Sequence, residues 1–150
     1  MVRHESHHEI DRMRYLIDTN IFIFYAVDRN QLDKDILYIL NDCGNIIHIS
    51  SESVKELIHV FQNGRIKTRR WKTPEDILYN IREDLGFTIN YVKKEHLYTL
   101  ARLEPVAGHN DPSDRLIIAQ AITERIPLIS SDRKFEAYRK QQLQFIFNRR

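Results

Sequence analysis

The stretch Tyr15-Leu16-Ile17-Asp18-Thr19-Asn20 joins a short apolar run to a predicted buried helix at residues 19–27. The apolar run predicts a buried strand over residues 15–18, with Asp18 at its carboxyl end. Open α/β sheets carry their binding and catalytic groups at this edge. An acid in this place can equally be the N-cap of the following helix, so the stretch leaves both roles open.

The rest of the chain alternates short apolar runs with segments of helical spacing. Further strands are predicted at residues 46–49, 87–92, 128–130 and 143–147, and further helices at 33–41, 50–63, 73–86, 94–103 and 111–125. Strands separated by helices along the whole chain favour a parallel sheet covered on both faces. We therefore predict an α/β fold of three layers, in which helices flank a central parallel β-sheet.

The composition indicates one ordinary globular domain. The 150 residues are 42% hydrophobic and 29% charged, and the net charge of +2 is too small to argue for nucleic acid by itself. Cys43 is the only cysteine, which excludes an internal disulfide framework and suits a reducing compartment. No apolar stretch reaches the roughly 20 residues that span a bilayer, so we expect a cytoplasmic protein without membrane contact.

The N-terminal segment, residues 1–12, differs from the rest of the chain. It is polar, lacks the apolar centre of a signal peptide, and is followed by Met13 directly before the first strand. We interpret residues 1–12 as a flexible leader or an expression remnant, and residues 13–150 as the folded domain. The three histidines of the leader are a secondary candidate for metal binding: His4, His7 and His8.

Asp114 carries the strongest functional signal of the acidic residues. Its neighbours at i+3, i+4 and i+7 form the centre of the apolar stripe of its helix: Ile117, Ile118 and Ala121. A carboxylate on a buried face is costly unless it is paired or binds a metal ion. The alternatives are an interaction with the helix dipole and an ion pair with Arg115. N-capping explains Asp111 better than it explains Asp114.

Asp132 and Glu56 are more ambiguous. Asp132 follows the predicted strand at 128–130, but it can also cap a short helix that runs through Phe135 and Tyr138. Glu56 lies opposite the apolar stripe of its helix, and Ser53-Val54-Lys55-Glu56 matches a capping box, so periodicity favours a solvated or capping role. Carboxylates gathered at strand ends repel one another unless a divalent cation lies among them, so the acids as a set predict a metal site.

A basic run follows the helix predicted at 50–63. Its cations are Arg65, Lys67, Arg69, Arg70 and Lys72, with Trp71 among them. Five cations and an aromatic ring in eight residues can neutralise phosphates and stack on a base of RNA. The equally favoured alternative is a solvated loop whose Trp71 packs in the core.

Four segments together resemble the PIN-domain ribonucleases, and within them the VapC-like toxins of prokaryotic type II toxin–antitoxin systems. They are Met13-Arg-Tyr-Leu-Ile-Asp18-Thr-Asn20, Ser51-Glu-Ser-Val-Lys-Glu56-Leu57, His109-Asn-Asp-Pro-Ser-Asp-Arg-Leu-Ile-Ile-Ala-Gln-Ala121 and Ile129-Ser-Ser-Asp132. The resemblance covers Met13 to about Phe147, and the third segment is the most specific. The chain departs from the family at Ser113, where an aromatic residue is usual.

The resemblance implies a Rossmann-like PIN domain whose acids converge at one edge of the sheet. It assigns Asp18, Glu56, Asp114 and Asp132 to the catalytic cluster, and so overrules the periodicity at Glu56. Within that cluster we expect Asp18, Asp114 and Asp132 to be the ligands of Mg²⁺ or Mn²⁺, since both cations prefer oxygen. The residues expected to support the cluster are Asn20, Asp111 and Ser131.

The resemblance also implies an activity and partners. The activity is metal-dependent endoribonuclease cleavage that leaves a 5′-phosphate and a 3′-hydroxyl. The partners are an RNA substrate, a small VapB-like antitoxin and a second copy of the chain.

Two other classes of function use similar residues. A phosphotransfer receiver or an aspartyl-phosphate hydrolase also has an Asp at a strand end. The hydrolase pattern needs a second Asp where this chain has Asn20, and a receiver needs a Lys after the last strand, where the chain has Asn148-Arg149. The remaining class is a non-catalytic module that binds RNA or a protein partner and whose acids are structural.

Overall fold

The computed structural model describes residues 13–149 and centres on a five-stranded sheet. The strands are β1 (Arg14–Ile17), β2 (Ile46–Ser50), β3 (Thr88–Asn90), β4 (Leu128–Ser130) and β5 (Phe145–Phe147). They lie in the order β3-β2-β1-β4-β5, and every neighbouring pair is parallel. Parallel pairing brings the carboxyl ends of all five strands to one edge of the sheet.

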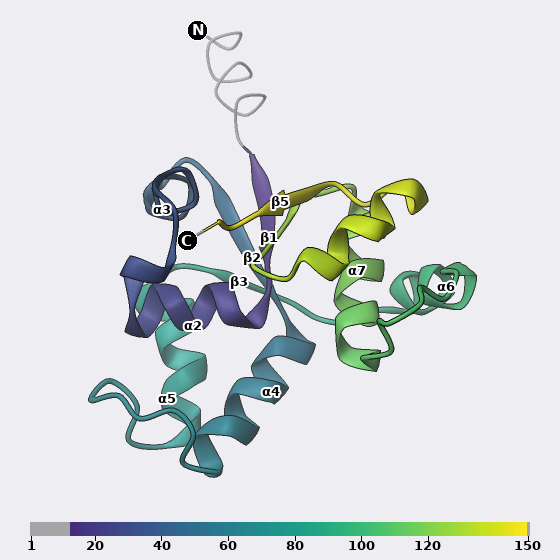
Figure 1. Ribbon diagram of the computed structural model, residues 1–150. Coiled ribbons are helices and arrows are strands. Elements are labelled where there is room, and N and C mark those ends of the chain that lie inside the picture. Colours follow the sequence, from purple (N-terminus) through teal and green to yellow (C-terminus); the bar gives the residue numbers. More distant parts are fainter. Residues whose placement is uncertain (1–12, 150) are drawn as a thin grey trace, which may run out of the picture.

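Helices cover both faces of this sheet (Figure 1). They are α2 (Thr19–Val27), α3 (Lys34–Asn41), α4 (Ser51–Gln62), α5 (Pro74–Tyr79), α6 (Lys94–Arg102) and α7 (Pro112–Glu124), with short 3₁₀ helices η1 (Arg29–Gln31) and η3 (Arg133–Gln141) and a π-helical turn η2 (Asn80–Asp84). Between residues 13 and 149, no helix is both long and apolar enough to cross a membrane.

The two faces of β1 contribute to two separate hydrophobic cores. Ile17 packs in a core with buried residues of α2, α3, α4 and α5, whereas Leu16 packs in a second core with α7 and η3. Successive side chains of a strand point to opposite faces, so neighbouring residues of one strand belong to different layers. The prediction of three layers around a parallel sheet is confirmed.

Three predicted elements are longer than the elements that the structure has. The helix predicted over 73–86 divides into α5 and the π-helical turn, in which the Leu85 N–H donates to the Asn80 carbonyl over 3.0 Å. The strand predicted over 87–92 is only β3, because its partner β2 ends at Ser50, opposite Asn90, where α4 begins. The strand predicted over 143–147 likewise shortens to β5, since the Leu143 N–H closes η3 by donating to the Tyr138 carbonyl.

Trp71 belongs to the core and not to the surface of the basic run. Its side chain is 3% exposed and stacks on Phe22, with ring centroids 6.1 Å apart, while Phe61 meets it edge-on. The prediction that this ring stacks on an RNA base is therefore wrong, and the alternative of a core residue is confirmed. The sequence could not separate the two, because a tryptophan within a basic loop has the same local composition in either case.

The burial of Trp71 predicts a large loss of stability on truncation. Trp71→Ala is expected to lower the free energy of unfolding by about 3–5 kcal/mol, since it removes a large buried ring and leaves a cavity. Urea denaturation measures this difference. The control is Tyr38→Ala, because the Tyr38 side chain is 74% exposed; its effect should stay within about 0.5 kcal/mol. Equal effects of the two substitutions would contradict the core position of Trp71.

Candidate active site

Asp18 lies at the carboxyl end of β1, between the two halves of the sheet. Its backbone N–H donates to Ile129 in β4 over 2.9 Å, and its residue is 6% exposed. One carboxylate oxygen accepts from the Thr19 N–H at 2.8 Å, so Asp18 is the N-cap of α2. The other oxygen accepts from the Ser130 hydroxyl at 2.7 Å. The capping interpretation is thus confirmed, but it explains only one of the two oxygens.

Asp114 occupies the first turn of α7, directly above the apolar stripe that the sequence predicted. Ile117, Ile118 and Ala121 are buried, and the Asp114 side chain is 25% exposed. Asp111 is the N-cap of this helix and accepts from the Ser113 and Asp114 N–H groups at 2.9 and 3.2 Å. Asp111 therefore caps the helix, as expected, and Asp114 does not.

The electrostatics of Asp18 and Asp114 join the two carboxyls in one site. The pKa of Asp18 is raised to about 7, mainly by burial and further by the nearby carboxylates of Asp114 and Glu56, against the lowering effect of its hydrogen bonds. The pKa of Asp114 is also raised to about 7, first by burial and then by the carboxylates of Asp111, Glu56 and Asp132. Asp114 consequently interacts through space with each of the other four acids.

Glu56 lies on α4 and is exposed to solvent, as its periodicity predicted. The predicted capping box is wrong, because the helix begins earlier: its N-cap is Ser50, whose hydroxyl accepts from the Glu52 N–H at 3.0 Å. Ser53 is instead buried within the helix, where its hydroxyl accepts from Thr19 over 2.8 Å. Glu56 makes no cap, and its carboxylate is close enough to raise the pKa of both Asp18 and Asp114.

Asp132 follows β4 and is the N-cap of η3. Its carboxylate accepts from the Lys134 N–H at 2.9 Å, and its own N–H donates to the Ser130 hydroxyl at 3.0 Å. The alternative of a capping role is confirmed here too. Because its charge also raises the pKa of Asp114, capping does not remove Asp132 from the site.

Within the part of the chain that the structure describes, Asn20 and Ser131, which were expected to support the acidic cluster, make no hydrogen bond to its carboxylates. The Ser131 hydroxyl accepts from the Asn148 amide at 2.9 Å, and the contact expected of Ser131 is made by Ser130. Asn20 is exposed, and its side chain makes no hydrogen bond within residues 13–149. The register of β1 and β4 could have indicated this contact of Ser130. The two strands pair Ile17 with Ile129, so the residues that follow them, Asp18 and Ser130, lie side by side.

Two further contributors were not predicted from the sequence. Glu52 on α4 accepts a hydrogen bond from the Ser113 hydroxyl of α7 at 3.2 Å, so the departure from the family at Ser113 joins the two helices beside the site. His109 lies 3.3 Å from an oxygen of Asp114, measured from its Nε2 atom. Burial lowers the pKa of His109, which favours the neutral form of the ring.

The donors of the site suit a hard divalent cation. All candidate ligands are carboxylate oxygens, and the repulsion that raises the pKa of Asp18 and Asp114 is what a dication reverses. In the described part of the chain, no group of three or more His, Cys, Asp or Glu side chains is already close enough to hold a metal ion. The residues therefore fit Mg²⁺ or Mn²⁺ by charge and ligand type, and the side chains would need to draw together on binding.

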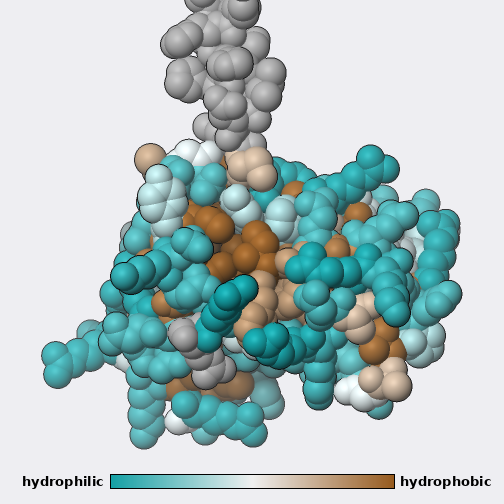
Figure 2. All heavy atoms as spheres, turned by 45° about the horizontal axis from the view of Figure 1, so that its top comes forward, coloured by the Kyte–Doolittle hydropathy of each residue, from teal (hydrophilic) through white to brown (hydrophobic). Residues whose placement is uncertain are grey.

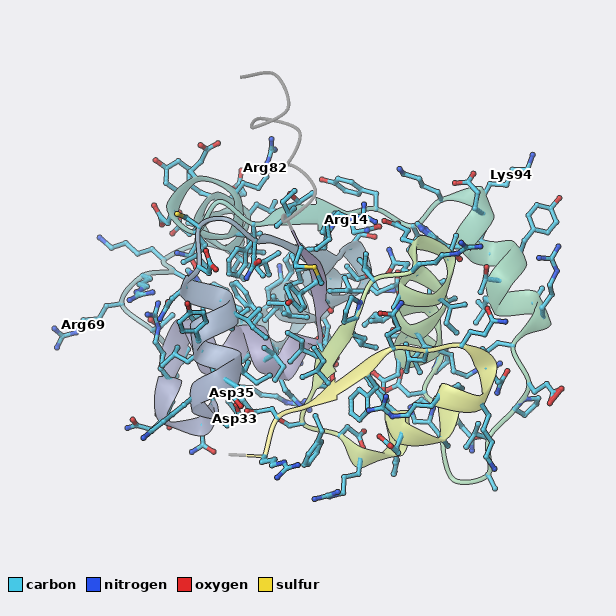
Figure 3. All side chains as sticks on the ribbon, turned by 90° about the horizontal axis from the view of Figure 1, so that it is seen from above. Arg14, Asp33, Asp35, Arg69, Arg82 and Lys94 are labelled. Carbon is cyan, nitrogen blue, oxygen red and sulfur yellow. The ribbon has the colours of Figure 1, made fainter. Side chains whose placement is uncertain are left out.

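The five cations of the basic run all lie on the exposed loop between α4 and α5. Arg69 extends from this loop away from the body of the protein (Figure 3). The alternative prediction of a solvated loop is therefore confirmed, and its cations are exposed to solvent, where a polyanion could bind them.

A surface groove lies away from the acidic residues of the site. It has a volume of about 1170 Å³ and lies between α3, β5 and η3, lined by residues that include Ile36, Phe147, Asp33, Arg133 and Arg139. Figure 2 shows apolar surface in the middle of the face that lies nearest the viewer, bordered by hydrophilic side chains. The volume of this groove does not identify the candidate active site, because the carboxylates with raised pKa values lie at the carboxyl edge of the sheet.

The fold and the site define a class: a three-layer α/β domain with strand order 3-2-1-4-5 and acids gathered at its carboxyl edge. The family model described as "PIN domain" matches residues 15–141. The chain belongs to the PIN domain family. A comparison with curated proteins found no match.

Solved structures share this fold at low sequence identity. A chain of the VapBC2 complex from Rickettsia felis, bound to a DNA fragment from its promoter, has a TM-score of 0.69 and 21% identity, covering 91% of this chain and 99% of that one. The DNA-bound VapBC from Salmonella typhimurium gives 0.64 and 18%, with 90% and 98% covered. VapBC-1 from nontypeable Haemophilus influenzae gives 0.63 and 19%, with the same coverage of 90% and 98%.

The raised pKa of Asp114 predicts that the metal-free protein loses stability as pH rises. Below a pH of about 4 the carboxyl is protonated in both the folded and the unfolded chain. Between about 4 and 7 the folded protein keeps a proton that the unfolded chain has released, so each step upward in pH favours unfolding. Asp114→Asn, which cannot ionise, should stabilise the protein by about 1–3 kcal/mol near pH 8 and by less than half of that near pH 4.5.

Urea denaturation in EDTA at the two pH values measures this difference. The matched control is Asp35→Asn on α3, an exposed acid of the first helical turn outside the site. Its effect should be small and should not grow with pH. A gain from Asp114→Asn that is equal at both pH values would show that Asp114 is not held in its neutral form by its surroundings.

Proposed function

We propose that the protein is a metal-dependent endoribonuclease and the toxin of a type II toxin–antitoxin pair. The observation that carries the proposal is the shared rise in the pKa of Asp18 and Asp114, two acids from distant parts of the chain that meet at one edge of the sheet. Membership of the PIN domain family supports a nuclease. Perturbed carboxyls gathered at such an edge are typical of functional sites.

In this proposal Asp18, Asp114 and Asp132 hold Mg²⁺ or Mn²⁺, and Glu56 completes the catalytic cluster. A bound dication would supply positive charge for the scissile phosphate and would acidify a water molecule. Two carboxylates about 4 Å apart repel by roughly 4 kcal/mol at an effective dielectric constant of 20, so carboxylates that draw together to this distance would favour a cation between them.

The chain's own groups would orient and deprotonate the attacking water. Ser130 and Thr19 fix both oxygens of Asp18, and so define the directions of its remaining lone pairs. Glu56 is exposed, so its carboxylate is available as an acceptor for the proton that water loses. The water oxygen would attack phosphorus and O3′ would leave with a proton, which gives a 5′-phosphate and a 3′-hydroxyl.

The exposed basic loop would contribute to RNA binding. The loop follows α4, the helix that carries Glu56, and its five cations are Arg65, Lys67, Arg69, Arg70 and Lys72. Cations of this kind neutralise phosphates and release counterions, which gives affinity without sequence preference. The buried Trp71 would anchor the loop to the core and leave the charges outside.

The proposed partners follow from the likeness to VapBC complexes and VapC-like toxins. VapBC complexes are among the solved structures that share the fold, and this supports a small VapB-like antitoxin as partner. We also propose a homodimer, on the resemblance to VapC-like toxins. A toxin that cleaves RNA, and the antitoxin that controls it, would act in the cytoplasm.

The phosphotransfer alternative has no support in the site. The position after the last strand is held by Asn148, which is 1% exposed. Its amide donates to the Gln31 carbonyl and to Ser131, and its oxygen accepts from the Asp33 N–H. This residue fixes the end of β5 to the segment before α3, so it cannot reach a phosphoryl group at Asp18.

Purified protein with Mg²⁺ or Mn²⁺ should cleave RNA, and Asp114→Asn should reduce the rate by at least about 100-fold, because it removes a charged ligand. The fold should remain intact by circular dichroism. Asp35→Asn is again the control and should cleave like the unmodified chain. Undiminished cleavage by a folded Asp114→Asn protein, or cleavage that persists in EDTA, would refute the metal-dependent mechanism.

Expression in cells tests the toxin assignment separately. The unmodified chain should arrest growth and produce new RNA ends, and Asp18→Asn should do neither at equal protein level. Co-expression of the small protein encoded beside it should relieve the arrest, because an antitoxin would occupy the site. Tight RNA binding without metal-dependent turnover or arrest would instead favour a non-catalytic binding module.

A further inference from the structure

His109 is a buried polar residue to which the proposed mechanism gives no task. It is 4% exposed and lies in the turn before α7, where its N–H donates to the Val106 carbonyl over 3.1 Å. Its ring meets the ring of Phe135 edge-on at a centroid distance of 5.5 Å, and that of Tyr138 at 5.3 Å. Backbone and ring contacts together leave the imidazole little freedom to turn.

The imidazole connects Asp114 to two further side chains. Its Nε2 atom lies 3.3 Å from Oδ2 of Asp114, and its Nδ1 atom lies 2.7 Å from the hydroxyl oxygen of Tyr138. The same hydroxyl oxygen accepts from the Arg115 guanidinium at 3.4 Å. Arg115 is held in turn by the Leu103 carbonyl, to which it donates over 3.0 Å.

This chain of contacts selects one tautomer of the ring. Arg115 has only donors, so Tyr138 must use its oxygen as the acceptor towards it. The Tyr138 proton then has His109 Nδ1 as its acceptor, since a buried hydroxyl proton without a partner would be costly. A neutral imidazole carries a single N–H, and with Nδ1 as acceptor that N–H is on Nε2, facing the Asp114 carboxylate.

We propose that His109 is a positioning residue for Asp114: its Nε2–H holds Oδ2, and Tyr138 with Arg115 fixes the tautomer that makes this possible. The other oxygen of Asp114 is thereby left for the acidic cluster. The consequence for metal binding rests on the function proposed above, because Asp114 is there a ligand. Hydrogen-bond partners that orient metal ligands typically change metal affinity about 10–100-fold when they are removed.

The tautomer is tested on the metal-free full-length chain. Nitrogen-15 NMR of the histidine rings in EDTA reports which nitrogen carries the proton, and the missing signals of His109→Gln identify the residue. We expect His109 as the Nε2–H form in the unmodified protein and a mixture of both forms in Tyr138→Phe, which lacks only the hydroxyl. An Nδ1–H form in the unmodified protein would overturn the inference.

Mn²⁺ affinity tests the consequence with a matched pair of variants. His109→Gln places an amide nitrogen near the position of Nε2, whereas the shorter amide of His109→Asn reaches only the position of Nδ1. We expect His109→Asn to weaken Mn²⁺ binding about 10–100-fold and His109→Gln to recover most of the loss. Equal losses in both variants would indicate a merely structural role, and unchanged affinity in a folded His109→Asn protein would overturn the proposal.

The two measurements also separate this inference from the function on which it rests. If the unmodified chain binds no Mn²⁺, the proposed metal site fails, and the ring-proton measurement alone decides the position of the His109 N–H. If His109→Asn does not fold, Tyr138→Phe takes its place. Tyr138→Phe should then weaken Mn²⁺ binding by a smaller factor, and an unaltered affinity together with an unaltered tautomer would overturn the proposal.

Discussion

The rest of the structure depends on the burial of one carboxylate at the end of β1. Asp18 is 6% exposed, and an ionised carboxylate in that environment needs partners. The partners are the Thr19 N–H and the Ser130 hydroxyl, which come from the helix after β1 and from the neighbouring strand β4. The Ser130 hydroxyl is available only because β4 pairs with β1 in the sheet. The strand order is thus also the condition for the site.

The acids reach this edge from opposite layers of the molecule. Ile117 and Ile118 of α7 pack in the core that contains Leu16, whereas Val54 and Leu57 of α4 pack in the core that contains Ile17. Asp114 and Glu56 therefore arrive on helices that the sheet holds apart along most of its length. The hydrogen bond from Ser113 to Glu52 joins the same two helices across the edge.

How far the sequence predicted the site depended on whether the relevant information was local. Asp18 and Asp114 were predicted because a strand end and a buried helix face are visible in a short window of residues. Periodicity did not predict Glu56, because its proximity to Asp18 and Asp114 depends on how α4 packs beside them, which no spacing within α4 encodes; only the resemblance indicated it. Ser130 was not predicted for a similar reason, since the register between β1 and β4 decides which hydroxyl meets Asp18.

The sequence analysis treated capping and membership of the acidic site as alternatives, and the structure shows that an N-cap can also lie close to the other acids. Asp18, Asp111 and Asp132 are all N-caps, and all three also interact electrostatically with Asp114. Asp76 shows what capping does alone: it is exposed at the start of α5, and hydrogen bonds from the N–H groups of Thr73 and Lys72 lower its pKa. Asp18 also accepts a backbone N–H, yet burial and neighbouring carboxylates raise its pKa to about 7. The difference between the two residues lies in what surrounds the carboxylate and not in the cap itself, so a cap bond is no argument against a functional role.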